Sequence, residues 1–178
     1  MDINPFLDKC KLNEFVAIDL ETTGLSAKEE FIIEVSAVRF INGAEHETFS
    51  FLLNPGKPIP SFIEDLTGIS NSMVKGKPSF IDILDDFVEF VGKSPVVGHN
   101  VKFDIDFIKY HSNNKIDFSK TNLICDSYLL SKVVLFSNEE HSLEAISEFY
   151  DLPIEGSHRA LNDARNSGLV MINLLVQL

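Results

Sequence analysis

Residues 15–24 read FVAIDLETTG, in which four apolar residues are followed by Asp19, Glu21 and a Thr-Thr-Gly turn. A short, unbroken apolar run predicts a strand that is buried on both faces, as in the centre of an α/β sheet. We expect Asp19 and then Gly24 to close this strand. Because side chains two residues apart point to the same side of an extended chain, Asp19 and Glu21 are expected to face the same way.

The segments that follow predict two further strands in an antiparallel arrangement. Residues 31–41 (FIIEVSAVRFI) are rich in β-branched and apolar residues, and the Asn42-Gly43 pair after them is a strong hairpin signal. Residues 44–53 then return with polar residues in alternation, so this third strand is expected near an edge of the sheet.

The rest of the chain predicts helices separated by short strands. In residues 79–91 the apolar positions follow the i, i+3, i+4 rule of an amphipathic helix. The helices are expected at residues 61–66, 79–91, 101–111, 126–135, 142–150 and 162–177, and the strands at 94–98 and 123–125. Together these elements predict an α/β fold, a mixed five-stranded sheet with three antiparallel and then two parallel strands, flanked by helices.

Length and composition fit a single domain over residues 1–178. The net charge of -12 argues against a basic domain that coats nucleic acid, but it allows an enzyme that meets phosphate through bound cations. The two cysteines, Cys10 and Cys125, are too few for a disulfide framework and are typical of a reducing compartment. The first residues have neither a basic nor an apolar leader segment, and no run reaches the ~18 apolar residues of a membrane span. We therefore expect a cytoplasmic protein without a membrane partner.

Two further groups of polar residues stand at the edges of predicted elements. His99-Asn100 ends the strand at 94–98, and Asp104 falls in the first turn of the next helix. If that strand runs parallel to the one at 15–18, Asp104 lies next to Asp19, at the carboxyl ends where open α/β sheets bind ligands. Near the end of the chain, Asp163 is expected to begin the last helix, with His158 in the loop before it.

Each of these residues also has an ordinary structural explanation. An acid in a first turn is favoured by the helix dipole, and a single loop histidine is most often a surface residue. Adjacent carboxylates repel one another, however, and a divalent cation removes that cost. Four acids and a histidine at the edges of elements are therefore a coincidence that favours a metal site.

Three motifs carry a resemblance to a known family. They are Asp19-Leu-Glu21-Thr-Thr-Gly24-Leu25, His99-Asn100-x-x-Phe103-Asp104 and His158-Arg-Ala160-x-x-Asp163-Ala164. In order and spacing they resemble the three exonuclease motifs of the DEDDh, or DnaQ-like, 3'–5' exonucleases, over about residues 13 to 175. Within that family the chain is most similar to the proofreading exonucleases of bacterial DNA polymerase III, in the epsilon subunit or in PolC.

The resemblance implies a ribonuclease-H-like fold and a metal-dependent 3'–5' exonuclease that hydrolyses DNA to nucleoside monophosphates, in replication proofreading or repair. It assigns two divalent cations, Mg²⁺ or Mn²⁺, to Asp19, Glu21, Asp104 and Asp163, and the role of general base to His158. Hard cations prefer carboxylate oxygens, and histidine titrates near neutral pH, so these residue types suit the chemistry.

Contacts with the strand terminus are expected beside this site. The turn after Glu21 offers backbone N–H groups and hydroxyls, and two apolar side chains are expected to flank the last base. The segment Leu66-Thr67-Gly68-Ile69 resembles the family's stretch beside the terminal nucleotide, with Thr67 where the epsilon subunit has a histidine. The expected contact residues are Leu20, Thr22, Thr23, Gly24, Thr67, Ile69, Asn100 and Phe103. Lys75, Lys77, Lys102, Arg159 and Arg165 are candidates for phosphate contacts.

Alternative functions stay open at this point. One is a 3'–5' exoribonuclease that trims RNA or short oligonucleotides, because nothing in the sequence reads the 2'-OH. Another is a non-catalytic interaction module associated with a polymerase. A metal phosphatase is disfavoured, since an aspartyl-phosphate enzyme would have Asp in place of Glu21. The expected partners are the 3' end of single-stranded DNA and a polymerase subunit, and DNA affinity is expected to depend on the cations.

Overall fold

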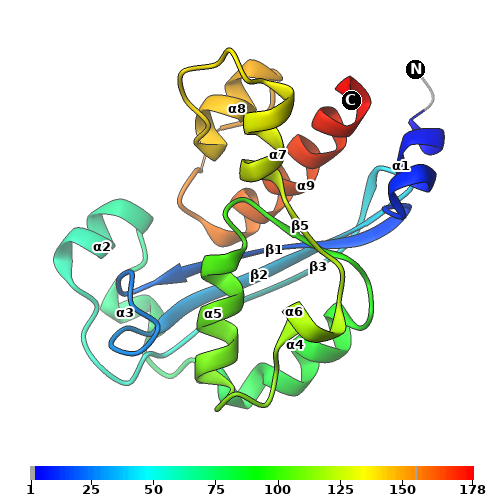
Figure 1. Cartoon of the computed structure of the whole chain (residues 1–178). Helices are drawn as coiled ribbons and strands as arrows, with labels where there is room; N and C mark the ends of the chain where they lie inside the picture. Colours follow the sequence, from blue (N-terminus) through cyan, green and yellow to red (C-terminus); the bar gives the residue numbers. More distant parts are fainter. Residues whose placement is uncertain (1–2, 155) are drawn as a thin grey trace.

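A mixed five-stranded sheet forms the centre of the computed structural model, which describes residues 3–154 and 156–178 (Figure 1). The strands are β1 (Glu14–Thr22), β2 (Ile32–Ile41), β3 (Ala44–Leu52), β4 (Val96–Gly98) and β5 (Ile124–Asp126), in the order β3-β2-β1-β4-β5. Strands β1 to β3 pair antiparallel, whereas β4 and β5 run parallel to β1. The predicted sheet is confirmed, with β3 at an edge.

Helices of different lengths flank the sheet. The helices of the described residues are α1 (Asn4–Cys10), α2 (Ser61–Thr67), α3 (Asn71–Val74), α4 (Leu84–Val91) after a 3₁₀ turn at Ile81–Ile83, α5 (Lys102–His111), α6 (Phe118–Thr121), α7 (Ser127–Val134), α8 (Leu143–Phe149) and α9 (Ala160–Gln177). The sequence did not predict three of them. The unpredicted helices α1, α3 and α6 have seven, four and four residues, too few to show a helical period. Within residues 3–154 and 156–178, no helix combines the length and apolar composition needed to cross a membrane.

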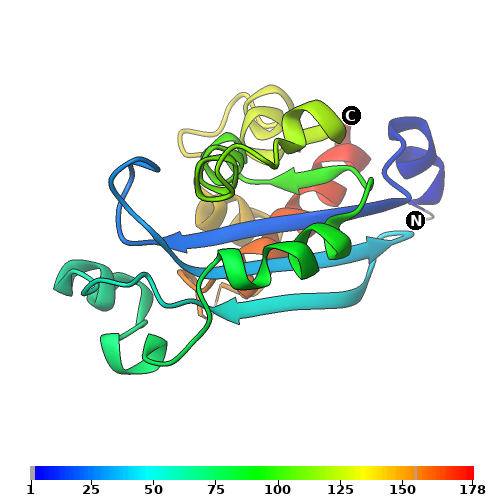
Figure 2. The same ribbon diagram turned by 90° about the horizontal axis from the view of Figure 1, so that it is seen from below.

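The sheet separates two hydrophobic layers. Side chains at even positions of β1, such as Val16 and Ile18, pack with α4 and α5. Side chains at odd positions, Phe15 and Ala17, pack with α9. In Figure 1, α7, α8 and α9 accordingly lie above the sheet and α4, α5 and α6 below it. Figure 2 views the sheet from below, with β1, β2 and β3 side by side and α4 across them.

Strand β1 is longer than its apolar run. We predicted that Asp19 would close the strand, and this is wrong, because β1 continues to Thr22. Asp19 pairs with Ser36 of β2 and Glu21 pairs with Glu34, so the antiparallel ladder keeps the chain extended through both acids. Asp19 and Glu21 consequently continue the row of odd positions that faces α9.

The hairpin between β2 and β3 has the predicted turn. Asn42 and Gly43 have φ angles of 51° and 79°, so both central residues are left-handed. This is the backbone that a two-residue hairpin turn of the I′ type requires, and Asn-Gly is the pair that adopts it most readily. The turn joins β2 to β3 and pairs Ile41 with Ala44. The separate ladder between β1 and β2 places Glu34 across from Glu21.

Candidate active site

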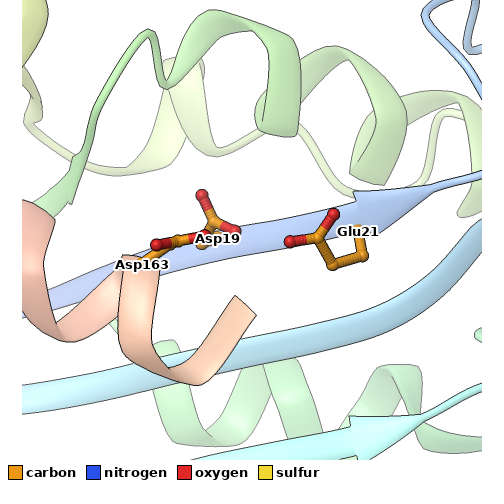
Figure 3. Close-up of side chains that lie close together, drawn as sticks. All are labelled: Asp19, Glu21 and Asp163. Atoms are coloured by element: carbon orange, nitrogen blue, oxygen red, sulfur yellow. The ribbon is translucent and has the colours of Figure 1, made fainter. Parts of the chain in front are cut away.

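Three carboxylates converge at the carboxyl end of β1. Asp19 and Glu21 project from the strand, and Asp163 comes from the first turn of α9 (Figure 3). One oxygen of each of the three lies within 4.8 Å of the others, and all three residues are partly buried. Residues 19 and 163 of the sequence are therefore brought together because α9 packs on the odd row of β1.

A fourth carboxylate comes from the opposite layer. Asp104 lies in the first turn of α5 and is 4% exposed. Strand β4, which leads to α5, is parallel to β1, so both strands end at the same edge of the sheet. Asp104 and Asp19 line the same cavity, and the negative charge of Asp104 contributes to raising the pKa of Asp19.

Burial and mutual repulsion disfavour ionisation of these acids. Burial is the main cause that raises the pKa of Glu21 to about 8, and the charges of Asp163 and Glu34 add to it. Burial also raises the pKa of Asp104 to about 8 and that of Asp163 to about 6. The pKa of Asp19 lies well above its usual value, through burial and then the charge of Asp104.

This group fits a divalent cation. The three converging donors are all carboxylate oxygens, without thiols or imidazoles, which is the set that Mg²⁺ and Mn²⁺ prefer over softer metals. Bound cations would replace the protons that the raised pKa values retain. The four carboxylates therefore suit a hard divalent metal.

The acids open onto a cavity of about 310 Å³. Its lining comes from β1, the β4–α5 connection, the start of α8 and the loop before α9. The lining residues are Asp19, Leu20, Glu21, His99, Asn100, Phe103, Asp104, Ser142, Leu143, Glu144, Ser157, His158 and Asp163. Of the expected contact residues, the cavity thus contains Leu20, Asn100 and Phe103. The Phe103 ring also packs against Phe107, with ring centroids 4.8 Å apart, so it serves both the cavity and the helix core.

His158 lies on the cavity wall in a constrained backbone. Its φ angle is 61°, which is left-handed and uncommon for a residue other than glycine. Its backbone N–H donates to Asp163 Oδ2 over 2.9 Å. The loop histidine and the acid on α9 are therefore held in a fixed relation by a direct hydrogen bond.

The Thr-Thr-Gly turn lies beside the cavity, outside its described lining. Thr22 Oγ1 donates to the Gly24 carbonyl over 2.6 Å, and Thr23 Oγ1 accepts from the Phe31 N–H over 2.9 Å. A Cβ added to Gly24 would lie 2.9 Å from Cγ of Glu30. Both hydroxyls thus hold the turn together in this structure, and glycine allows the close approach of Glu30.

Thr67 and Ile69 are also outside the described cavity lining. Thr67 Oγ1 donates to the Ile63 carbonyl over 2.8 Å and accepts from the Ile69 N–H over 3.1 Å, which closes the end of α2. Ile69 is fully buried in a cluster with Ile33 and Ile59. The side chains of Thr67 and Ile69 therefore stabilise the end of α2 and its packing on β2.

Several candidate phosphate contacts are held by carboxylates. Lys102 pairs with Asp106, Arg159 with Glu34 and Arg165 with Glu45. Lys75 and Lys77 are exposed after α3. The three paired residues are consequently less available to a nucleic-acid backbone than their sequence positions suggest.

The sequence did not indicate part of the cavity wall. Ser142, Leu143 and Glu144 enter it from the start of α8, where Ser142 Oγ accepts from the Ala145 N–H over 3.2 Å. A serine before an apolar helical run is a signal of a helix start. Nothing local shows that this start faces the acids, because that depends on the path of the chain after α7.

His99 also lines the cavity, and its hydrogen-bond partners are distant from it in the sequence. Its Nδ1 lies 3.0 Å from Ser127 Oγ, and its Nε2 lies 2.8 Å from the His141 carbonyl. Burial lowers the pKa of His99. The imidazole therefore ties the end of β4 to α7 and to the loop that leads into α8.

Comparison with known proteins places this geometry in context. Residues 16–171 match the model of the RNase_T family, described as exonuclease. The epsilon subunit of DNA polymerase III from Aquifex aeolicus is 39% identical over 165 residues, which cover 92% of this chain and 81% of that protein. The PolC-type DNA polymerase III of Caldanaerobacter subterraneus is 38% identical over 93% of this chain, but only 12% of that protein is covered. The 3'-5' exonuclease DinG of Bacillus subtilis is 39% identical over 92% of this chain and 18% of its own length.

Solved structures with low sequence identity share the fold. Exonuclease X in complex with 5' overhanging duplex DNA gives a TM-score of 0.72 at 23% identity, over 91% of both chains. E. coli Exonuclease I with a dA16 oligonucleotide gives 0.74 at 18% identity, over 92% of this chain and 40% of that chain. The expected ribonuclease-H-like architecture is thereby confirmed.

Proposed function

The chain belongs to the RNase_T family of exonucleases, and on that premise we propose that it is a metal-dependent 3'–5' exonuclease acting on DNA. It would release nucleoside monophosphates from the 3' end of a single strand. The observation that carries this proposal is the convergence of Asp19, Glu21 and Asp163 within 4.8 Å at the wall of a cavity. The names of the epsilon and DinG relatives support the direction of cleavage and a DNA substrate.

We assign two divalent cations, Mg²⁺ or Mn²⁺, to the four carboxylates. Asp19, Glu21 and Asp163 would hold the first, and Asp19 with Asp104 the second. When bound, such cations supply positive charge to the phosphodiester oxygens and lower the pKa of nearby water. The carboxylates themselves fix where that charge lies, because β1, α5 and α9 hold them in place from both layers of the fold.

His158 is proposed as the general base. It would accept a proton from the attacking water, whose oxygen forms the new bond to phosphorus while the bond to the 3' oxygen of the preceding nucleotide breaks. The leaving oxygen takes up a proton from solvent water, and His158 then returns its proton to solvent. A covalent enzyme intermediate is not required. The position of His158 on the cavity wall beside Asp163 supports this role.

The apolar part of the wall would receive the terminal nucleotide. Leu20, Phe103 and Leu143 offer apolar surface for a base, and Asn100 offers an amide for the sugar or phosphate. We further propose contacts from the turn at Thr22, Thr23 and Gly24. Thr67 and Ile69 would contribute indirectly, by holding the end of α2 in place.

The cellular setting is proposed from the relatives. The chain spans only about a tenth of the PolC-type proteins that it matches. We propose that residues 1–178 form one exonuclease domain that works with a DNA polymerase in replication proofreading or repair, in the bacterial cytoplasm. Cleavage of RNA is the alternative substrate class.

An end-labelled assay tests the activity. DNA and RNA strands of the same sequence, labelled at the 5' end, are incubated with Mg²⁺, Mn²⁺ or a chelator. We expect progressive shortening of DNA from the 3' end with a cation and no cleavage in the chelator. Asp104→Ala should abolish cleavage, whereas Asp106→Ala, an exposed acid on the same helix, should retain it. Failure of the wild-type protein to shorten either strand with any divalent cation would favour the non-catalytic binding module.

A further inference from the structure

An ion pair joins Glu34, which lies across the β1–β2 ladder from Glu21, to Arg159 before α9. Glu34 of β2 is 2% exposed, and its carboxylate accepts three hydrogen bonds. Arg159 Nη2 donates to Oε1 over 2.7 Å, Arg159 Nε donates to Oε2 over 3.1 Å, and the Ala160 N–H donates to Oε2 over 3.0 Å. Each Glu34 oxygen thus has at least one donor from the loop that leads into α9.

These bonds fix the residues between His158 and α9. The left-handed backbone of His158 is costly for a residue with a Cβ and persists only where its surroundings hold it. On one side, Asp163 Oδ2 accepts the His158 N–H. On the other, Glu34 holds both Arg159 and Ala160, the next two residues. The conformation of His158 is therefore determined by two acids, one on α9 and one on β2.

Glu34 also caps α9 from a distance. In the described structure the N-cap residue of this helix, Arg159, makes no capping hydrogen bond with its own side chain. The Ala160 N–H at the helix start donates to Glu34 instead, and a negative charge at a helix N-terminus is favourable. Because Asp163 lies three residues after Ala160, this bond helps to hold the first turn of α9, and with it Asp163, against β2.

Arg159 offsets the cost of burying the Glu34 carboxylate close to the acids of the cavity. The Arg159 side chain is 41% exposed and lies outside the described cavity lining. Its charge works to lower the pKa of Glu21, although burial and the neighbouring acids raise that pKa overall. The two-point contact of guanidinium with carboxylate is specific to arginine, since lysine cannot form it.

We propose that Glu34 and Arg159 are positioning residues, which place His158 and Asp163 for hydrolysis without contacting substrate or cations themselves. This inference rests on the proposed exonuclease function. The contact of Glu34 on β2 with Arg159 and Ala160 would thus align the general base with the metal ligands.

Two substitutions test the pair against a matched control. Glu34→Gln removes the charge and one acceptor, and Arg159→Lys keeps the charge but loses the two-point geometry. The control is Glu45→Gln, because Arg165 of α9 holds Glu45 in the same two-point manner, with distances of 2.7 and 3.0 Å, away from the cavity. Circular dichroism establishes which variants are folded, and Arg159→Lys carries the test if Glu34→Gln is not.

We expect kcat on single-stranded DNA to fall about 10- to 100-fold in Glu34→Gln and Arg159→Lys. KM should change by less than about threefold, since the apolar wall is intact. Mn²⁺ binding without DNA, measured by electron paramagnetic resonance, should weaken by about tenfold in both variants. Glu45→Gln should match the wild type, and the double variant Glu34→Gln/Arg159→Lys should be no worse than the poorer single variant.

The outcomes separate the two proposals. If the folded variants keep both kcat and Mn²⁺ affinity within about twofold of the wild type, the positioning role is wrong. An equal loss of kcat and Mn²⁺ affinity in Glu45→Gln overturns it as well. That result would mean that disturbing any ion pair of α9 lowers activity, wherever the pair lies. If the wild-type protein does not cleave DNA, the proposed function fails, while the Mn²⁺ titrations still decide whether the pair positions Asp163.

Discussion

The four acids of the candidate site lower the stability of the protein when no cations are bound. The pKa of Asp104 rises from 3.8 to about 8 on folding, so the folded state keeps a proton that the unfolded state releases. Between these values the folded state binds more protons, and its stability falls as pH rises. As pH rises and the four acids lose their protons, the repulsion between their charges increases, and the rest of the fold must hold them together against it.

A thermal unfolding series in a chelator checks this sign. We expect the Tm of the wild-type protein to fall from about pH 6 to about pH 8.5. Asp104→Asn should flatten that dependence and raise Tm at the upper end, whereas Asp106→Asn should leave it unchanged. A Tm that rises with pH, or an equal effect of the two substitutions, would contradict the account.

His158 can be tested separately from the acids. His158→Ala should lower kcat about 10²- to 10⁴-fold, the usual contribution of a general base, because the proton of the attacking water then lacks its acceptor. Mn²⁺ binding should be preserved, since the acids are untouched. His46→Ala, an exposed histidine on β3, is the control in the same DNA assay. Loss of Mn²⁺ affinity in His158→Ala would instead indicate a ligand.

At the scale of elements, local patterns predict what local interactions build. The apolar run at 15–18 predicts a buried strand, and Asn42-Gly43 predicts its hairpin turn. The pattern does not show that β1 continues through Asp19 and Glu21, because the pairing with β2 that extends it is long-range. The start of α9 at Ala160, two residues before the predicted start, has the same cause, since its cap is Glu34.

The candidate site divides in the same way. The acids and His158 follow from motif spacing, since each stands at the end of a predictable element. The start of α8 in the cavity wall does not, because only the three-dimensional path after α7 brings it there. Burial of Ile69 is likewise a tertiary result, which depends on how α2 and α3 pack against Ile33 and Ile59.

The packing of α9 on the sheet makes a prediction at this scale. A Cβ added to Gly168 would lie 2.4 Å from the ring of Phe40, which stacks on Phe15 with centroids 4.9 Å apart. Alanine normally stabilises a helix interior by ~1 kcal/mol over glycine, but overpacking a core costs ~1–3 kcal/mol. Gly168→Ala should therefore destabilise the protein in urea unfolding.

The matched background for this substitution is Phe40→Leu, which removes the ring that the new methyl group would meet. There the cost of Gly168→Ala should shrink or reverse, which a double-mutant cycle measures. An equal cost in both backgrounds would show that the Phe40 contact is not the cause.

For the whole molecule, net charge is the property that bears most on the proposed binding of DNA. The chain has 27 acidic and 15 basic residues, for a net charge of -12, and the proposed DNA substrate is also negative. Three of the basic residues near the site or on α9, namely Lys102, Arg159 and Arg165, are already paired with carboxylates. On the proposed function, attraction of the strand terminus would then come chiefly from the cations assigned to the acids.

Binding of DNA without cleavage tests this balance. With the His158→Ala variant and a fluorescent single strand, anisotropy should show at least tenfold weaker binding in a chelator than in Mg²⁺, because phosphate then meets ionised acids directly. The dependence of log K on log salt should be shallow, with a slope of roughly one to two, since few lysines and arginines displace counterions. Equally tight binding in the chelator, or a steep salt slope, would mean that basic side chains hold the DNA. The acidic composition would then be irrelevant to recognition, and the binding surface would have to lie away from the cavity.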